Sequence, residues 1–140
     1  MDERPDPAVL AEAVKGLSDD ELKAQISGLG TDLVLTQIFE GMRDAFDPGR
    51  AGSTSAVIQY EISTDEGQKQ WIVEIADGGC SVREGAAESP RLTLSLALQD
   101  FVRLIFNQVE GPQLFMSGKL KLKGDMMFAM TMQGFFKRDF

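Results

Sequence analysis

The chain has 140 residues, a formal net charge of −8, one cysteine and no histidine. This length fits one domain, since domains most often have about 100–150 residues. Cys80 has no partner for an internal disulfide, the lack of histidine removes the usual general base and zinc ligand, and the acidic balance disfavours binding to nucleic acid.

The first third of the sequence predicts three helices. A short helix is expected over residues 8–17, where apolar residues recur at helical spacing. Ser18 and Glu21 then form a capping-box pattern at the start of a second helix. Thr31 is the expected N-cap of a third helix, over residues 32–46, which has a broad apolar face.

After Pro48 the period of the apolar residues changes from about 3.6 to 2, which indicates strands. Residues 77–79, Asp-Gly-Gly, are typical of a tight hairpin turn. Local turns between four short strands predict an antiparallel meander that is covered on one face only. These strands are expected at residues 56–63, 70–76, 80–84 and 91–96.

The last third of the sequence predicts a helix, a fifth strand and a final helix. The first of these helices is expected over residues 98–109, with Gly111 and Pro112 ending it and residues 113–116 forming a turn. The fifth strand, residues 118–124, alternates inward leucines with outward lysines. Asp125 is the expected N-cap of the final helix.

Methionine and phenylalanine gather near the C-terminal end. Residues 115–140 hold 5 of the 7 methionines and 5 of the 9 phenylalanines. Flexible methionines suit an adaptable wall around a ligand of variable shape, although composition alone favours a helix that packs on a sheet as ordinary core. The lysines of the fifth strand have two readings as well, a guard against aggregation or a contact with an anion.

Three stretches resemble the sterol carrier protein 2 family of non-specific lipid-transfer domains. They are IQYEI…QWIVEI…GGCSV, PRLTLSLALQDFVRLIFNQVEG and LFMSGKLKLKGDMMFAM, the last of which carries the pattern F-x-x-GKLK-x-x-GD-x-x-x-A-M. The resemblance implies an α+β fold with a five-stranded, mainly antiparallel sheet covered on one face by helices, and an apolar cavity between the layers. Residues 1–30 would form an N-terminal helical extension, and residues 31–140 the lipid-binding domain.

The resemblance further implies non-catalytic binding and transfer of a fatty acid, fatty acyl-CoA, phospholipid or sterol-like lipid, without a metal or cofactor. The expected ligand-binding residues are Phe101, Ile105, Phe115, Met116, Met126, Met127, Met130, Phe39, Met42 and Phe46. The final helix and residues 134–140 are expected to act together as a lid, and residues 134–140, rich in phenylalanine and basic side chains, to touch membranes transiently.

Three alternatives stay open beside this interpretation. The first is an accessory factor that presents a hydrophobic biosynthetic intermediate to partner enzymes. The second is a small enzyme with a buried carboxylate base, and the third is an interaction module whose methionines are plain core. The sequence also has no signal-peptide layout at its start, no run of ~20 apolar residues, and no Ser-Lys-Leu peroxisomal signal at its end. We therefore expect a cytoplasmic location.

Overall fold

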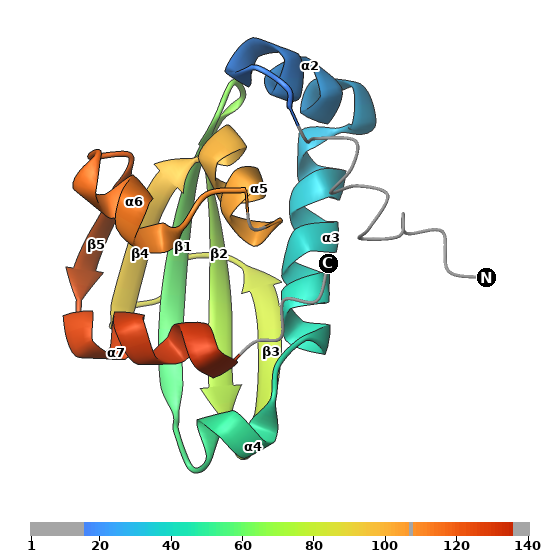
Figure 1. Cartoon of the computed structure of the whole chain (residues 1–140). Helices are drawn as coiled ribbons and strands as arrows, with labels where there is room; N and C mark the ends of the chain where they lie inside the picture. Colours follow the sequence, from blue (N-terminus) through green and yellow to red (C-terminus); the bar gives the residue numbers. More distant parts are fainter. Residues whose placement is uncertain (1–15, 107, 136–140) are drawn as a thin grey trace.

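The structure, a computed structural model, describes residues 16–106 and 108–135 of the chain. A five-stranded sheet carries helices on one face (Figure 1). The elements are α2 Asp19–Leu29, α3 Thr31–Asp44, α4 Pro48–Ala51, β1 Ala56–Thr64, β2 Gly67–Ala76, β3 Gly79–Glu84, β4 Leu92–Ala97, α5 Leu98–Ile105, α6 Gly111–Met116, β5 Leu120–Gly124, α7 Met126–Met132 and a 3₁₀ turn, η1, Gln133–Phe135. The predicted α+β class is confirmed.

The strands lie in the order β3-β2-β1-β4-β5. The pairs β1–β2, β2–β3 and β4–β5 are antiparallel, whereas β4 runs parallel to β1. The sheet is therefore mixed and mostly antiparallel, as predicted. The predicted meander of the first four strands is wrong, because β4 lies beside β1 and not beside β3.

A buried glutamine holds the segment that makes this crossover. Residues 85–91 pass over the sheet face that carries no helices, and Gln59 of β1 holds them there. The Gln59 amide donates a hydrogen bond to the Gly85 carbonyl at 3.0 Å and accepts one from the Ala87 N–H at 2.6 Å. Alternation alone placed Gln59 among solvent-facing residues, although it is buried. Its side chain satisfies backbone groups that would otherwise lose their partners away from water.

The helices of the first third begin at residues with clear local causes. The predicted capping box is confirmed, since the Ser18 hydroxyl accepts from the Glu21 N–H at 3.2 Å and the Glu21 carboxylate accepts from the Ser18 N–H at 3.3 Å. The prediction of Thr31 as an N-cap is wrong. Gly30, with φ 101°, is the N-cap of α3, and Thr31 is its first residue and is buried.

The order of elements in the last third is confirmed with two corrections. Helix α5 ends at Ile105, four residues before the predicted end. Gly111 and Pro112 begin a helix, α6, where a turn was predicted over residues 113–116. Proline is well suited to a first helical turn, because its fixed φ is already helical and the first N–H groups of a helix have no intrahelical partner. The lysines of the β5 region are exposed and Leu120 is buried, as predicted.

The start of α7 is locked onto the start of β4. The Asp125 side chain accepts a hydrogen bond from the Phe128 N–H at 2.9 Å, which confirms the predicted N-cap. Gly124 has φ 113°, and a Cβ there would collide with the Arg91 carbonyl oxygen. The Asp125 N–H donates to that same carbonyl at 3.0 Å. Glycine is therefore required at position 124 both by its backbone conformation and by this close approach.

The core continues across the predicted boundary between residues 30 and 31. Leu22 and Ile26 of α2 are buried in the same apolar cluster as α3 and the sheet. The predicted helix at residues 8–17 lies outside the described residues except for its end. Residues 136–140 of the predicted lid lie outside them as well.

Candidate functional site

Four aromatic side chains form the centre of the helix-covered sheet face. Phe39 of α3 stacks on Trp71 of β2, with ring centroids 4.7 Å apart and planes 10° apart, and meets Tyr60 of β1 edge-on at 5.2 Å. Phe101 of α5 lies 5.3 Å from Phe39 and 5.6 Å from Tyr60. All four are buried. We call this cluster the aromatic floor. It holds two predicted ligand contacts, Phe39 and Phe101, together with Tyr60 and Trp71.

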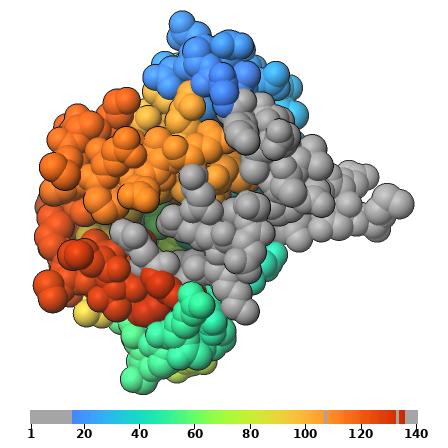
Figure 2. All heavy atoms as spheres, viewed as in Figure 1, coloured from blue at the N-terminus to red at the C-terminus, as the bar shows by residue number. Residues whose placement is uncertain are grey.

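Half-buried apolar side chains pack against the core to which this floor belongs. Three of them were predicted to contact ligand, namely Met42, Phe46 and Ile105. Phe106, Val109 and Leu122 have the same partial burial. Figure 2 shows a hollow between the orange segment, which contains α6, and the red helix α7, with green atoms visible inside it. Apolar groups from the helices and the sheet therefore remain partly accessible beside a rigid base.

The other five predicted contacts lie on the surface. They are Phe115, Met116, Met126, Met127 and Met130, with exposed fractions from 45% for Met126 to 87% for Met116. We call these five residues the methionine surface. Helix α7 instead turns Phe128, Ala129 and Met132 into the core. Phe128 and Met132 have the i, i+4 spacing of residues on one helix face, so the sequence contained a signal for the buried face. The prediction instead placed the ligand-facing side at Met126, Met127 and Met130. Contact of the methionine surface with a ligand stays a prediction.

Arg91 fixes the inner side of α7. Its guanidinium lies 4.2 Å from the centre of the Phe128 ring and 3.1 Å from the Asp125 carboxylate. The Phe128 N–H, and after it the Arg91 side chain, hold the pKa of Asp125 below its ordinary value. The start of α7 and its inward face are thus held by a cap, an ion pair and a cation–π contact. None of these three contacts involves the outward methionines of α7.

One buried carboxylate was not predicted from the sequence. Asp100, in the first turn of α5, is only 7% exposed. Burial raises its pKa, while the charges of Lys119, Arg103 and Lys23 lower it less. The spacing of the apolar residues on α5 did not predict that Asp100 is buried, because Asp100 is not part of that apolar pattern.

The described residues offer little for metal or thiol chemistry. Within residues 16–106 and 108–135, no group of three or more cysteine and acidic side chains could hold a metal ion. Burial raises the pKa of the half-buried Cys80 thiol to about 11, an effect that the nearby Arg43 only partly offsets. A thiol with such a pKa is protonated at neutral pH and is a poor nucleophile.

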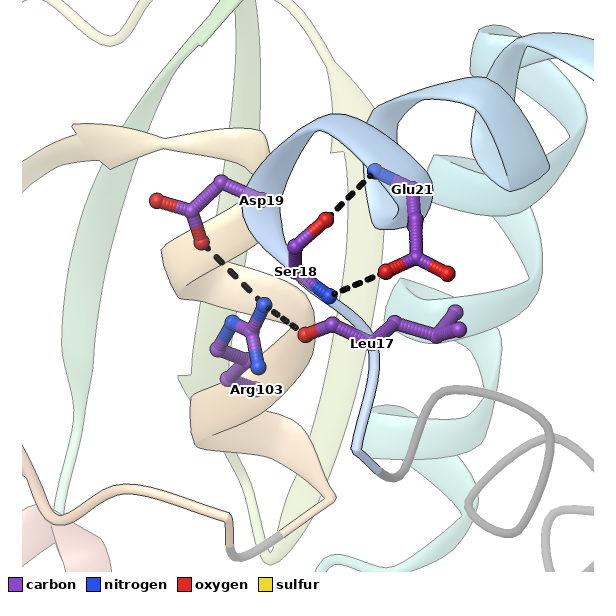
Figure 3. A network of polar contacts seen from close by, with 5 residues as sticks. All are labelled: Leu17, Ser18, Asp19, Glu21 and Arg103. Carbon is purple, nitrogen blue, oxygen red and sulfur yellow. Dashed lines mark hydrogen bonds and ion pairs between the residues drawn. The ribbon is translucent and has the colours of Figure 1, made fainter.

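A second, polar pocket of about 180 Å³ opens where α2, the β1–β2 turn and the start of α5 meet. Its lining residues are Lys23, Ile26, Ser27, Thr31, Ser63, Thr64, Asp65, Ala97, Leu98 and Gln99. Figure 3 shows how α2 is held against α5: the Arg103 guanidinium donates to the Leu17 carbonyl at 2.7 Å and to the Asp19 carboxylate at 3.1 Å. These bonds fix the wall of the pocket that α2 supplies.

A family model described as the SCP-2 sterol transfer family matches residues 35–137. The chain is 32% identical over 120 residues to the oleate-induced peroxisomal protein POX18 of Candida maltosa, which covers 84% of this chain and 94% of that protein. It is 29% identical over 98 residues to hydroxysteroid dehydrogenase-like protein 2 of Rattus norvegicus, which covers 69% of this chain but 18% of that longer protein.

Solved structures agree with these relatives. The crystal structure of sterol carrier protein 2 like 2 from Aedes aegypti matches at 26% identity with a TM-score of 0.64, over 75% of this chain and 98% of that chain. A solution structure of the palmitated SCP2L2 of the same organism matches at 27% identity with a TM-score of 0.60, over 69% and 88% of the two chains. No helix among the described residues is long and apolar enough to cross a membrane.

Proposed function

Since this chain belongs to the SCP-2 sterol transfer family, whose members bind and transfer lipids, we propose that it is a non-catalytic carrier of a lipid with an acyl chain. The observation that carries the proposal is the set of half-buried apolar side chains that pack against the core of the fold, together with the hollow between the segment of α6 and α7 in Figure 2. The palmitated Aedes aegypti relative supports an acyl chain as the ligand.

The energy of chain burial fits a carrier that must also release its cargo. Each methylene removed from water contributes about 0.8 kcal/mol, so a ligand that buries about 12 of them gains roughly 10 kcal/mol. The lost freedom of the ligand offsets several of these kcal/mol and leaves affinity on the order of 1 μM. Such a complex forms readily and dissociates on the timescale of exchange between membranes.

The methionine surface is proposed as the entrance to this site. Met116, Met127 and Met130 expose most of their side chains at the edge of the helix layer. Unbranched thioether side chains adapt to chains of different shape, which suits a passage better than a fixed pocket wall. The exposed lysines of the β5 region and the predicted contact of residues 134–140 with membranes would bring an anionic bilayer close to this entrance.

Native mass spectrometry of the protein purified from its expression host tests the proposal, followed by extraction and identification of bound molecules. We expect a co-purified fatty acid or phospholipid, or else saturable binding of a fluorescent fatty acid added to the empty protein. A protein that is empty and also fails to bind the fluorescent fatty acid would overturn the carrier. Tight binding without transfer between vesicles would favour the accessory factor that presents a hydrophobic intermediate to partner enzymes.

The cellular location is a separate part of the proposal. The sequence favours the cytoplasm, whereas the Candida maltosa relative is named as peroxisomal. Fluorescence microscopy of the tagged chain in its own cells distinguishes the two, and the carrier proposal holds in either compartment.

A further inference from the structure

The three most exposed large apolar side chains among the described residues are all methionines. Met116 is 87% exposed, and Met127 and Met130 are each 77% exposed. Together with Met126 they come from α6 and α7, the two helices that precede and follow the edge strand β5 (Figure 1). Met132 of α7, by contrast, is buried. The exposed sulfur-containing side chains of the described part of the chain are therefore gathered at one edge of the fold.

The fold is held by other side chains than these methionines. Helix α7 is attached through the Asp125 cap, the ion pair of Arg91 with Asp125, and the buried ring of Phe128. Changes at exposed positions away from such contacts usually alter stability little. A chemical change at the exposed methionines can therefore alter what this surface binds while the protein stays folded.

The single cysteine competes poorly with these methionines for an oxidant. Peroxides react with the thiolate and not readily with the protonated thiol. Burial raises the pKa of the half-buried Cys80 thiol to about 11, so the thiol stays protonated at neutral pH. The thioethers of α6 and α7 are thus the sulfur groups of the described residues that are most open to oxidation.

We propose that the methionine surface is a site of oxidation by hydroperoxides, and that its sulfoxide form slows the entry of lipid. The inference rests on the proposed entrance and adds a way to regulate it. A thioether sulfur attacks the outer oxygen of the hydroperoxide, so that an S–O bond forms as the O–O bond breaks, and the hydroperoxide proton moves to the leaving oxygen. The sulfur is oxidised to the sulfoxide, and the hydroperoxide is reduced to an alcohol, or to water when it is hydrogen peroxide.

A sulfoxide changes how an acyl chain interacts with this surface. It converts a flexible apolar side chain into a polar one. An acyl chain that passes Met127 and Met130 then loses the apolar contact that favours its departure from water. Methionine sulfoxide reductases restore the thioether, and the exposure of these side chains leaves them open to such an enzyme. The change is therefore reversible.

Treatment of the full chain with hydrogen peroxide, followed by mass spectrometry of its peptides, tests the site. We expect added oxygen at Met116, Met127 and Met130 before any at the buried Met132. Transfer of a fluorescent fatty acid between vesicles should then slow by roughly threefold to tenfold, and a methionine sulfoxide reductase should restore it. Equally fast oxidation of Met132 and Met127 would overturn the proposal, and so would unchanged transfer by the oxidised protein.

Two variants separate oxidation of this surface from damage elsewhere. The double variant Met127→Leu and Met130→Leu keeps apolar side chains that peroxide does not oxidise, so its transfer should respond much less to peroxide, whatever its rate before treatment. Met132→Leu replaces a buried methionine by a side chain of similar volume and should keep the full response. A full response in the double variant would overturn the proposal. Urea denaturation of the oxidised wild type completes the test, since a loss of the folded state would attribute the slower transfer to unfolding and overturn it as well.

Two further oxidants separate the sources of hydroperoxide, with free methionine as the reference for reactivity. Faster oxidation of Met127 and Met130 by the hydroperoxide of linoleic acid than by tert-butyl hydroperoxide assigns the carried lipid as the source, and equal rates assign a peroxide in solution. A wild type that neither binds nor transfers the fluorescent fatty acid overturns the carrier and this inference together. Normal transfer that the sulfoxides leave unchanged overturns the inference alone.

Discussion

The aromatic floor and the methionine surface both consist of large, mainly apolar side chains, but they differ in burial and in the contacts that those side chains make. Phe39 and Phe101 have no exposed surface, whereas Met116 exposes 87% of its area. The aromatic rings contact one another at fixed distances and angles. In the described part of the chain, the outward methionines of α7 make no such ring contacts, and Phe128 and Asp125 hold the helix in place from its other side.

This difference separates stability from the proposed transport. A closely packed aromatic cluster resists changes of volume and keeps one geometry. Exposed methionines contribute little to folding and keep their rotamer freedom, which is what an entrance for flexible chains requires. An interpretation of the sequence that counts only apolar residues assigns both groups to the same ligand-binding surface. The following substitutions test whether the two groups are as distinct as their burial indicates.

The largest effect is expected from Phe101→Ala in the aromatic floor. Removing a fully buried phenylalanine takes away its contacts with Phe39 and Tyr60 and leaves a cavity, with a loss of about 3–5 kcal/mol in the free energy of unfolding. Urea denaturation followed by Trp71 fluorescence measures it. The matched change is Phe115→Ala on α6, where the side chain is 49% exposed, and the expected loss is about 1 kcal/mol or less. Similar losses at both positions would contradict the distinction.

A smaller effect is expected where the methionine surface is attached to the fold. Gly124→Ala should destabilise the protein by about 3 kcal/mol, at the upper end of the cost of an unfavourable φ, because the added Cβ also meets the Arg91 carbonyl. Gly118→Ala is the control, since Gly118 has a positive φ of 80° but nothing within 4 Å of the new Cβ. Thermal unfolding compares the two. Equal losses would show that the close approach to Arg91 adds nothing.

Much of the fold could be predicted from the sequence, because its causes are local. The period-2 stretches gave strands within a few residues of β1 to β5, and Ser18 and Asp125 were recognised as caps by their chemistry. The parallel position of β4 could not be predicted in this way. It depends on Gln59, whose buried amide bonds to residues 26 and 28 positions away. An alternating pattern carries no information about such a partner.

The candidate site was predictable only in part, and the reason is similar. Spacing on a helix tells which residues share a face, but the neighbouring elements decide which face is inside. On α7 the contact of Arg91 with Phe128 settles that question, and Arg91 comes from the start of a strand 37 residues earlier in the chain. The polar pocket was invisible for the same reason, since it joins three distant turns of the chain.

A modest, pH-dependent effect is expected from Asp100→Asn beside the aromatic floor. Burial raises the Asp100 pKa above its ordinary 3.8, so the fold favours the protonated carboxyl. Its stabilising contribution is complete below pH 3.8 and is lost as the pH rises through the raised pKa. Asparagine resembles the protonated form at every pH. The variant should therefore be more stable than the wild type at pH 7, and the difference should disappear in acid.

Urea denaturation at several pH values measures this difference. Glu88→Gln removes the same charge from an exposed loop of this acidic chain and corrects for the general effect of net charge. A destabilised Asp100→Asn at pH 7 would mean that the attraction of Lys119 and Arg103 outweighs burial, which is the opposite of the assigned cause. The Asp100 carboxylate would then stabilise the fold through its attraction to Lys119 and Arg103.

The smallest effect on stability, and the sharpest test of the comparison, is expected from the double substitution Met127→Gln and Met130→Gln. Both side chains are 77% exposed, so the free energy of unfolding should change by no more than about 0.5 kcal/mol. Transfer of a fluorescent fatty acid between vesicles should nevertheless slow down, because the proposed entrance becomes polar. Leu33→Gln is the control, since Leu33 is 53% exposed on α3, outside the methionine surface. Unchanged transfer in the double variant would remove the methionines from the path of the lipid and leave the half-buried rim of the aromatic floor as its only candidate contact.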